Sequence, residues 1–228
     1  MSIRDFKYNK KRISIELNSE ADESVFNEIF IERDYKALEE IIKGTVNPVI
    51  DIGAHIGVFV VYVRALNLNV PIFAYEPEEE NFKALKNNLK LNHCEKNIIA
   101  KNLAVAGEEA VKTLYISQDS HNHSLVNPTE NSKKTQTTTL QKILQKTGVC
   151  DLVKMDCEGA EFEILRSMGP ADFRKIKNIY VEYHEYLPEL KSAGLKQILE
   201  KNGFKVKLTP SHYDKRMGFL FASSQARS

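Results

Sequence analysis

The feature that most constrains the fold is an alternation of short apolar segments with segments of helical periodicity, which begins after Pro48. Short apolar runs are typical of buried strands, and apolar residues that recur every three to four positions are typical of helices. Their alternation predicts an α/β fold with a mostly parallel sheet covered by helices on both faces. The last two strands lie close enough to form a hairpin, which predicts an antiparallel edge. The predicted strands are 49–52, 70–75, 98–105, 111–116, 151–155, 179–183, 204–208 and 218–222, the predicted helices are 57–66, 78–91, 140–144, 160–168 and 187–202, and a long polar loop is predicted at 117–135.

The first part of the chain has a different pattern. Residues 11–17 alternate enough to be a short strand, and apolar residues within 23–42 recur at helical spacing until Gly44 supplies a stop. We therefore predict an N-terminal strand and helical extension at 1–45, followed by one domain at 46–228. The amphipathic segment 23–42 is also suited to an interface, which leaves an oligomer open.

Composition excludes several classes of protein. A chain of 228 residues supports one sizeable domain, and 32 Lys+Arg against 31 Asp+Glu give a formal net charge of +1, so there is no strong signal for nucleic acid or an anionic membrane. Cys94, Cys150 and Cys157 form no CxxC pair, which argues against a disulfide framework or a structural zinc site. The polar N-terminus does not resemble a signal peptide, and the longest apolar stretch, 56–68, is interrupted by Arg64. We expect a soluble, cytoplasmic protein.

The turn after the first strand of the main domain carries the sequence VIDIGAHIGVFV. It places Asp51 before Gly53 and Gly57, in a GxxxG spacing that differs from the GxGxxG of dinucleotide sites. A dinucleotide needs backbone amides aimed at its pyrophosphate. A carboxylate before the turn better suits a partly cationic ligand without phosphate, such as S-adenosylmethionine with its ammonium and sulfonium groups. A tight turn with a capping acid is the structural alternative.

The second strand ends in FAYEPEEENF, which places Glu76 at the same predicted sheet edge. A carboxylate at this position accepts hydrogen bonds from ribose hydroxyls in nucleotide-binding folds. The alternative is that Glu76 caps the next helix. Glu78, Glu79 and Glu80 fit that alternative better, because acids in a first helical turn favour the dipole and Pro77 separates them from Glu76. We therefore favour a ligand role for Glu76.

A third acidic strand end lies in DLVKMDCEGAEFEIL. Asp156 follows an apolar strand, and Glu158 and Glu161 flank a glycine that begins a helix. Clustered carboxylates raise the electrostatic energy unless a cation, a sulfonium or protonation relieves it. Solvated acids at a helix N-terminus are the alternative, and that alternative explains Glu161 better than Asp156.

The segment NIYVEYHEYLP places Glu182 and His184 two residues apart, and therefore on one face of a strand. His184 is suited to a general base or a metal ligand, and a structural histidine is an equally good interpretation. We predict Asp156, Glu182 and His184 as the catalytic residues, since all three lie at neighbouring strand ends. The same three side chains are predicted as ligands of Mg²⁺ or Mn²⁺. Without a metal, His184 is the first choice for the base, with Glu182 orienting it.

These segments together resemble the FkbM-type methyltransferases. The matching pieces run in the family's order from about residue 25 to residue 185, and they are NEIFIERDYKALEE, VIDIGAHIG, FAYEPEEENFKALKNNLKLN, DLVKMDCEGAEFEIL and IYVEYHE. The resemblance implies a Rossmann-like methyltransferase fold, with a mostly parallel seven-stranded sheet and an antiparallel C-terminal hairpin strand. It makes 46–228 the S-adenosylmethionine-binding catalytic domain. It also implies methyl transfer to a hydroxyl on a sugar, polyketide or other small metabolite.

The resemblance also assigns residues and partners. It implies that 120–125 closes over the adenine, that His121 or His123 contacts substrate, and that the acceptor is a small molecule or a glycan. A nucleic-acid or protein methyltransferase and a non-catalytic S-adenosylmethionine-binding protein remain as alternatives, whereas the GxxxG spacing disfavours a nicotinamide-dependent oxidoreductase. The implied cofactor-binding residues are Asp51, Gly53, Ala54, Gly57, Glu76, Asn102 and Ala104.

Overall fold

The computed structural model describes residues 2–187, 190–211, 214 and 216–225. The strands are β1 (Ser2–Tyr8), β2 (Lys11–Leu17), β3 (Val49–Ile52), β4 (Ile72–Tyr75), β5 (Ile98–Lys101), β6 (Ala104–Ala106), β7 (Val111–Ile116), β8 (Asn131–Thr139), β9 (Cys150–Met155), β10 (Ile176–His184), β11 (Phe204–Pro210) and β12 (Met217–Ser224). The helices are α1 (Glu20–Asn27), the π-helix η1 (Glu28–Glu32), the 3₁₀ helix η2 (Lys36–Leu38), α2 (Glu39–Gly44), α3 (Val58–Leu66), α4 (Glu79–Leu91), α5 (Leu140–Thr147), α6 (Glu161–Ser167), α7 (Pro170–Phe173) and α8 (Ser192–Lys201).

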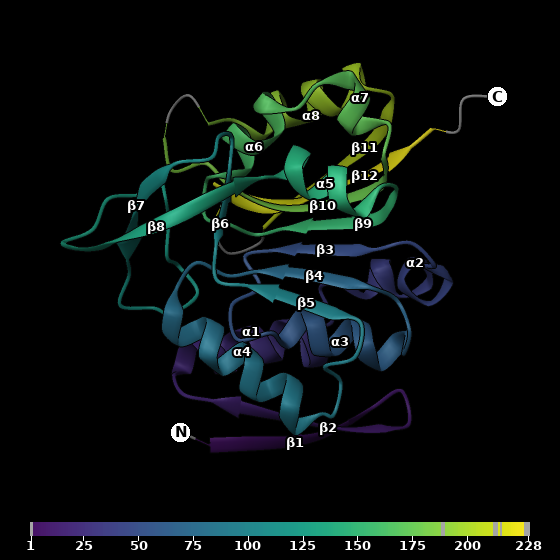
Figure 1. The fold of residues 1–228 in the computed structure, drawn as a ribbon, viewed down its shortest axis with the longest axis vertical. Helices are drawn as coiled ribbons and strands as arrows, with labels where there is room; N and C mark the ends of the chain where they lie inside the picture. Colours follow the sequence, from purple (N-terminus) through teal and green to yellow (C-terminus); the bar gives the residue numbers. More distant parts are fainter. Residues whose placement is uncertain (1, 188–189, 212–213, 215, 226–228) are drawn as a thin grey trace.

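Within the described residues, the main sheet has seven strands in the order β11-β12-β10-β9-β3-β4-β5 (Figure 1). The pairs from β10 through β9, β3 and β4 to β5 are parallel, whereas β12 is antiparallel to both β10 and β11. The predicted α/β class, with a mostly parallel sheet and an antiparallel C-terminal strand, is confirmed.

The C-terminal hairpin of β11 and β12 forms an antiparallel edge of the sheet, as predicted. β12 lies second from the edge and buries Leu220 and Ala222 completely, while β11 lies outermost. β11 carries Lys205 and Lys207, which suit an edge strand because charged side chains oppose pairing with another chain. The more apolar of the two strands therefore takes the inner position.

Helices cover both faces of the sheet, with α5 to α8 on one side and α1 to α4 on the other (Figure 1). Successive strand residues point to opposite faces, so Ile50 and Val153 join the buried cluster under α5 to α8. Val49 and Leu152 join the second cluster, which includes residues of α3, α4 and the N-terminal segment. Burial on both faces explains why β3 and β9 are almost continuously apolar. None of the described helices combines the length and the apolar character that crossing a membrane requires.

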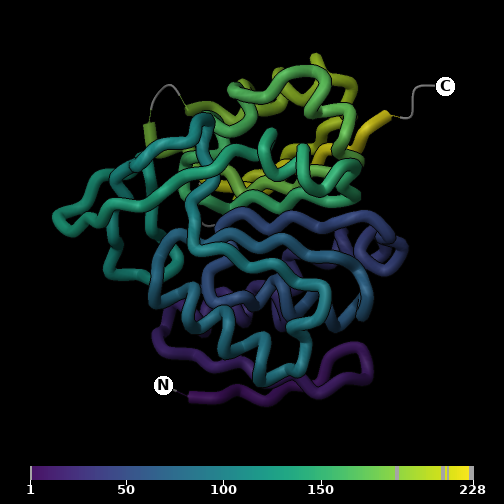
Figure 2. Tube along the Cα trace, in the orientation of Figure 1, coloured from purple at the N-terminus to yellow at the C-terminus, as the bar shows by residue number. Residues whose placement is uncertain are grey.

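The N-terminal segment shares the second core cluster with the sheet. The predicted strand 11–17 is confirmed as β2, which pairs with β1 in a hairpin, and 23–42 is divided among four short helical pieces. Phe26, Phe30 and Ile42 are buried in the same cluster as α3, so the apolar residues that suggested an interface pack inside this chain. Figure 2 shows the hairpin, in purple, at the opposite end of the molecule from the C-terminal third. The division at residues 45 and 46 stays a prediction.

The predicted loop 117–135 is partly wrong, because its last residues belong to β8. The sequence of β8, NSKKTQTTT, is almost entirely polar and shows no apolar alternation, so periodicity could not reveal it. In the described part of the chain β8 lies between β6 and β7 in a separate three-stranded sheet. The predicted strand 98–105 is likewise divided, with β5 in the main sheet and β6 in the small one.

Two asparagines of α4 hold the hairpin to the main domain. The Asn88 side chain accepts a hydrogen bond from the Glu16 N–H at 2.7 Å and donates one to the Ile56 carbonyl at 2.9 Å, and Asn88 is completely buried. Asn92 exchanges two hydrogen bonds with the backbone of Ser14, at 2.9 and 2.7 Å. Side-chain amides thus replace the strand partner that this edge of β2 lacks.

We expect Asn88→Ala to lower the free energy of unfolding by about 2 kcal/mol, because it leaves a buried N–H and a buried carbonyl without partners. Urea unfolding followed by circular dichroism measures the change. Asn87→Ala is the matched control, since Asn87 is exposed on the same helix and should change stability by less than about 0.5 kcal/mol. Equal effects of the two substitutions would contradict the anchoring role.

Candidate active site

A cavity of about 870 Å³ opens where the parallel strands of the main sheet end. Its wall combines the turns after β3, β4 and β9, the end of β10, the loop around residues 120–125, the N-terminal helical pieces, and β11 and β12. Ligands of open α/β sheets bind at this edge. Seven of the predicted site residues line the cavity, namely Gly53, Ala54, Glu76, Ala104, Asp156, Glu182 and His184. Asp51, Gly57 and Asn102 do not line it and lie behind its wall.

Gly53 sits where two strand ends touch. Its φ of +75° is in the left-handed region, and a Cβ at this position would lie 1.7 Å from the carbonyl oxygen of Asp156. The turn after β3 therefore rests directly on the turn after β9, which only glycine permits. Gly57 has a different task, because a Cβ there would meet Leu85 of α4 at 3.0 Å. Gly57 lets the start of α3 pack against α4 behind the cavity.

Glu76 is held in place by backbone amides. Its Oε2 accepts a hydrogen bond from the His55 N–H at 2.8 Å, and its Oε1 accepts one from the Glu78 N–H at 2.9 Å. The N-cap of α4 is Glu78, which accepts from the N–H groups of Glu80 and Asn81. Glu78 therefore caps α4, which was the alternative role considered for Glu76. Burial raises the pKa of Glu76 to about 7, despite the two amides that favour its charged form.

Asn102 supports the same turn from behind. Its side-chain amide donates to the carbonyl oxygens of Glu76 at 2.9 Å and Pro77 at 3.0 Å. Asn102 therefore fixes the backbone that presents the Glu76 carboxylate to the cavity. Ala104 lies two residues further on and forms part of the wall itself.

Lys154 is a site residue that the sequence analysis missed. Its ammonium group is buried between the two central strands, where it donates to the Gly53 carbonyl at 2.9 Å and lies 3.4 Å from both Asp51 and Asp156. Burial lowers the pKa of Lys154, but the two carboxylates outweigh it and raise the pKa overall. Burial raises the pKa of Asp51 to about 6 against the attraction of Lys154. The sequence did hold a signal for this role. Lys154 lies within an apolar strand, two residues before Asp156, so both side chains point to the same face of the sheet.

A hydrogen-bonded group joins the loop around residue 120 to three other elements. Ser120 donates to Asp22 Oδ1 at 2.8 Å, and His55 Nε2 lies 3.1 Å from the Ser120 hydroxyl and 3.3 Å from Asp22 Oδ1. The Asn81 side chain donates to the Ser120 carbonyl at 2.8 Å. Ser120, His121 and the following residues therefore line the cavity beside the turn after β3. Their closure over an adenine stays a prediction.

His184 is surrounded by carboxylates. It is 1% exposed, with Nε2 3.5 Å from Glu158 Oε1 and Nδ1 3.7 Å from Glu161 Oε1. Burial lowers its pKa, but Glu158 and Glu161 outweigh this effect and raise the pKa to about 10. His184 is therefore protonated near neutral pH, which opposes the predicted role of proton acceptor. Among the described residues Glu182 is not an ion-pair partner of His184, so the orienting carboxylates are Glu158 and Glu161.

Glu161 has a structural task in the same cluster. Its carboxylate is completely buried and accepts hydrogen bonds from the N–H groups of Cys157 and Gly159, both at 2.8 Å. The first residue of α6 thus folds back and fixes the turn after β9. This arrangement differs from the solvated helix N-terminus that the sequence suggested for Glu161.

The predicted metal ligands are grouped differently in space. Donor atoms of Asp156, Glu158 and His184 all lie within 4.8 Å of one another, and Glu182 is not part of this group in the described portion of the chain. Glu158 takes the predicted place of Glu182 because the turn after β9 brings its carboxylate beside the Nε2 atom of His184. Tyr186 donates a hydrogen bond to Glu158 Oε2 and stacks on the ring of His184.

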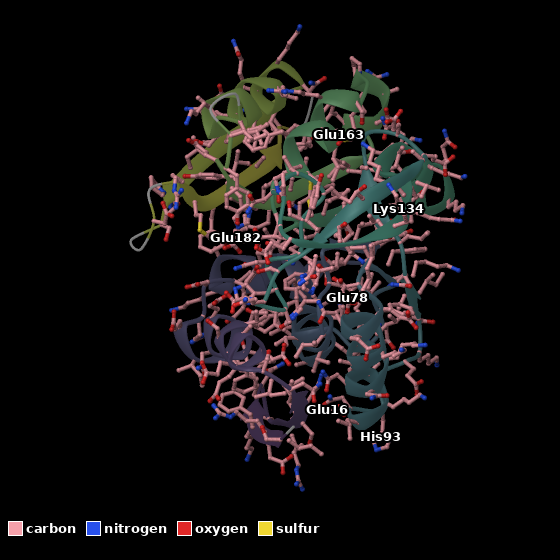
Figure 3. The ribbon with its side chains drawn as sticks, turned by 90° about the vertical axis from the view of Figure 1, so that its left-hand side faces the viewer. Glu16, Glu78, His93, Lys134, Glu163 and Glu182 are labelled. Atoms are coloured by element: carbon pink, nitrogen blue, oxygen red, sulfur yellow. The ribbon has the colours of Figure 1, made fainter. Side chains whose placement is uncertain are left out.

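Glu182 faces the N-terminal side of the cavity. In Figure 3, which looks onto the edge where these strands end, its label lies at the boundary between the C-terminal and N-terminal parts. Burial and the negative charge of Asp156 raise the pKa of Glu182 well above that of an ordinary carboxyl group. The nearby wall includes Glu28 and Tyr35 of the N-terminal segment, which sequence reasoning did not assign to the site. Helical periodicity indicates that residues of this segment pack against the rest of the protein. It does not indicate which edge of the sheet they reach.

Comparison with known proteins gives the class and the family. The family model of the methyltransferase FkbM domain matches residues 51–206. The chain is 25% identical over 182 residues to Methyltransferase 1 of Beauveria bassiana, covering 69% of this chain and 72% of that protein. It is 24% identical over 217 residues to Methyltransferase sdnD of Sordaria araneosa, covering 80% of this chain and 82% of that protein.

Solved structures share the fold. Methyltransferase FkbM from Methylobacillus flagellatus KT superposes with a TM-score of 0.55 at 16% identity, covering 78% of this chain and 43% of that one, so this chain spans less than half of its length. The methyltransferase domain of METTL16 gives a TM-score of 0.55 at 17% identity, covering 93% of this chain and 72% of that one. The fold and the strand-end cavity define an S-adenosylmethionine-dependent methyltransferase. Within that class, the chain belongs to the FkbM methyltransferase family.

We expect Gly53→Ala to lower the free energy of unfolding by about 3 kcal/mol or more, because the new Cβ would overlap the Asp156 carbonyl at a positive φ. The substitution should also abolish binding of S-adenosylhomocysteine in calorimetric titrations. Gly194→Ala is the control, since a Cβ at Gly194 in α8 meets nothing within 4 Å. That variant should be as stable as the natural protein or more so, by about 0.5–1 kcal/mol. A well-folded Gly53→Ala protein with unchanged affinity would contradict the contact.

Proposed function

We propose that the protein transfers the methyl group of S-adenosylmethionine to a hydroxyl oxygen of a small-molecule or glycan acceptor. The observation that carries this proposal is that one cavity holds both halves of such a site. The turns after β3 and β4 contribute Gly53, Ala54 and Glu76 to its wall and β6 contributes Ala104, while the ends of β9 and β10 contribute Asp156 and Glu182. In-line methyl transfer needs donor and acceptor side by side in a site that excludes water.

The side formed by the turns after β3 and β4 suits the cofactor. The Glu76 carboxylate is fixed by two amides and still has lone pairs free for ribose hydroxyls. Asp51, Gly57 and Asn102 support this side from behind, through Lys154, α4 and the Glu76 carbonyl respectively. We assign these three residues to shaping the cofactor site without touching the cofactor.

The opposite side suits a ring-bearing, hydroxylated acceptor. Tyr180 packs between Tyr35 and Phe219, with ring centroids 5.2 and 5.6 Å apart. Aromatic faces bind the apolar faces of rings, and the carboxylates of Asp156 and Glu182 beside them accept hydrogen bonds from hydroxyls. Tyr35 and Phe219 both lie outside the region that the family model matches, whereas Glu76 and Asp156 lie inside it. Asp156, Tyr180 and Glu182 of the acceptor side also lie inside the matched region, so Tyr35 and Phe219 add to an acceptor side that the match covers in part.

The charge of the cavity favours this acceptor over nucleic acid. Glu28, Glu32 and Asp34 of the N-terminal segment add to the carboxylates at the strand ends. A polyanion would be repelled by such a wall. The three free cysteines suit a reducing compartment and support the expected cytoplasmic location.

We assign the proton transfer to Glu182. A neutral hydroxyl is a poor nucleophile, and the Glu182 carboxylate, which lines the cavity, is placed to accept the hydroxyl proton in its ionised form. The acceptor hydroxyl gives its proton to Glu182 while its oxygen bonds to the methyl carbon. The bond from that carbon to sulfur breaks, which leaves a methyl ether and S-adenosylhomocysteine. In the metal-free protein the protonated His184 stabilises the surrounding carboxylates. A Mg²⁺ or Mn²⁺ ion remains part of the proposal as a second means of activating the hydroxyl.

A panel of acceptors tests the function. Release of S-adenosylhomocysteine is measured by mass spectrometry with sugars, glycosides and polyketides, and in parallel with RNA and protein substrates. We expect turnover with a hydroxylated small molecule or glycan, and a methyl ether in the product. Turnover confined to RNA or protein, or binding of the cofactor without turnover on any acceptor, would contradict the proposal.

We expect cofactor affinity to rise about tenfold between pH 6 and pH 8. The pKa of Glu76 is raised to about 7 in the free protein, so the carboxylate that accepts ribose hydroxyls forms as the pH increases through 7. Isothermal titration with S-adenosylhomocysteine at four pH values measures the trend. Glu76→Gln should bind more weakly at pH 8 and lose most of the pH dependence. An identical pH profile in that variant would assign the titration to another group.

We expect Glu182→Gln to lower kcat by about 10²- to 10⁴-fold while leaving the affinity for S-adenosylhomocysteine within about twofold, because it removes the base but not the cofactor side. Steady-state kinetics with the best acceptor of the panel gives kcat. Glu200→Gln on the exposed face of α8 is the control and should leave kcat unchanged. A Glu182→Gln variant with normal kcat would remove Glu182 from the chemistry.

A further inference from the structure

The side chains around His184 form a donor cluster that the proposed proton transfer does not use. Asp156 and Glu158 come from the turn after β9, and His184 comes from the end of β10. All three line the cavity, and their donor atoms lie within 4.8 Å of one another. His184 is almost completely buried, its Nδ1 atom has no hydrogen-bond partner among the described residues, and its Nε2 atom lies 3.5 Å from Glu158 Oε1.

The distances in this cluster suit donors that share a central ion. A protonated histidine paired directly with a carboxylate makes hydrogen bonds of about 2.7–2.9 Å, whereas His184 Nε2 and Glu158 Oε1 are 3.5 Å apart. Donors bound to one cation at about 2.0–2.3 Å lie roughly 3 Å apart at right angles and roughly 4–4.6 Å apart on opposite sides. The 3.5 Å between His184 Nε2 and Glu158 Oε1 falls in that range, and the donor atom of Asp156 completes a group whose members all lie within 4.8 Å of one another.

The surroundings of the cluster match those of a metal-bound histidine. The Nδ1 atom of His184, which points away from Glu158, lies 3.7 Å from the carboxylate of Glu161. Two backbone N–H groups fix that carboxylate, and the Tyr186 hydroxyl fixes the second oxygen of Glu158. Metal-bound histidines generally place their other ring nitrogen against a carboxylate, which orients the ring and raises its basicity.

We propose that Asp156, Glu158 and His184 bind one divalent cation of the Mn²⁺ type, with its remaining coordination positions open to the cavity. Two carboxylates offset its charge, and Mn²⁺ accepts both carboxylate and imidazole ligands. Binding displaces the proton of His184, as metal binding to histidine generally does. Glu158 replaces Glu182 in the ligand set that the sequence suggested, which leaves Glu182 available as the base.

The position of the cluster gives the cation a function. Asp156 ends β9 beside Lys154 and the turn that carries Gly53, so a cation here lies between the cofactor side and the acceptor side. It would hold the acceptor oxygen and lower the pKa of its hydroxyl. This role rests on the proposed methyl transfer, whereas binding of the cation does not.

Titration of the full-length, cofactor-free protein with Mn²⁺ tests the site. Electron paramagnetic resonance measures free Mn²⁺, and we expect saturable binding of one ion per chain. Glu158→Gln should weaken binding by about 100-fold or more. Glu182→Gln is the matched control, because it neutralises a neighbouring carboxylate of the same cavity, and it should bind Mn²⁺ within about threefold of the natural protein.

Three outcomes would overturn the proposal: no saturable binding by the natural protein, normal binding by Glu158→Gln, or a loss of binding in Glu182→Gln as large as that in Glu158→Gln. Titration of each variant with S-adenosylhomocysteine shows that it is folded. The same titration separates the two hypotheses, because a protein that binds the cofactor analogue but not Mn²⁺ loses only the cation site. A protein that binds Mn²⁺ but transfers no methyl group loses only the proposed function.

Discussion

The buried ammonium of Lys154 connects the two central strands on which the site is built. Removing a charge from water is costly unless oppositely charged and hydrogen-bonding partners surround it. Lys154 finds these partners in Asp51 of β3, in Asp156 after β9 and in the Gly53 carbonyl between them. The same group therefore fixes both the turn after β3 and the carboxylate of Asp156 at the cavity. Gly53 makes the arrangement possible, because any side chain there would push the two turns apart.

The partners of each carboxylate decide what it does in the cavity. Glu76 and Glu161 are each held by two backbone N–H groups, but Glu76 faces the cavity whereas Glu161 supports a turn. Glu158 lies beside the protonated His184, which moderates the rise that burial causes in its pKa. Glu182 lies near Asp156 without a comparably close cationic partner among the described residues, so its proton affinity rises further. Residues of one chemical type thus acquire distinct tasks from their surroundings.

The N-terminal segment completes the site from the opposite direction. Its hairpin is anchored to α4 by Asn88 and Asn92, and its short helical pieces bring Glu28 and Tyr35 to the end of the sheet. This wall precedes residue 51, where the match to the family begins. The segment ahead of the matched region therefore contributes part of the cavity wall.

The sequence by itself determined the α/β class, the mostly parallel sheet and the segments that carry the cofactor side. Apolar periodicity reports burial on both faces, and the carboxyl ends of parallel strands must meet at one edge, so Gly53, Glu76 and Asp156 were predictable. The tertiary structure alone decided that carboxylates surround His184 and raise its pKa, that Glu158 and not Glu182 lies beside it, and that Lys154 belongs to the site. These facts depend on distances between residues far apart in the chain and on the loss of solvent around them. The sequence did not predict strand β8, because its residues are polar and show no apolar alternation. Pairing with β6 and β7, which are contacts between separate segments, makes it a strand.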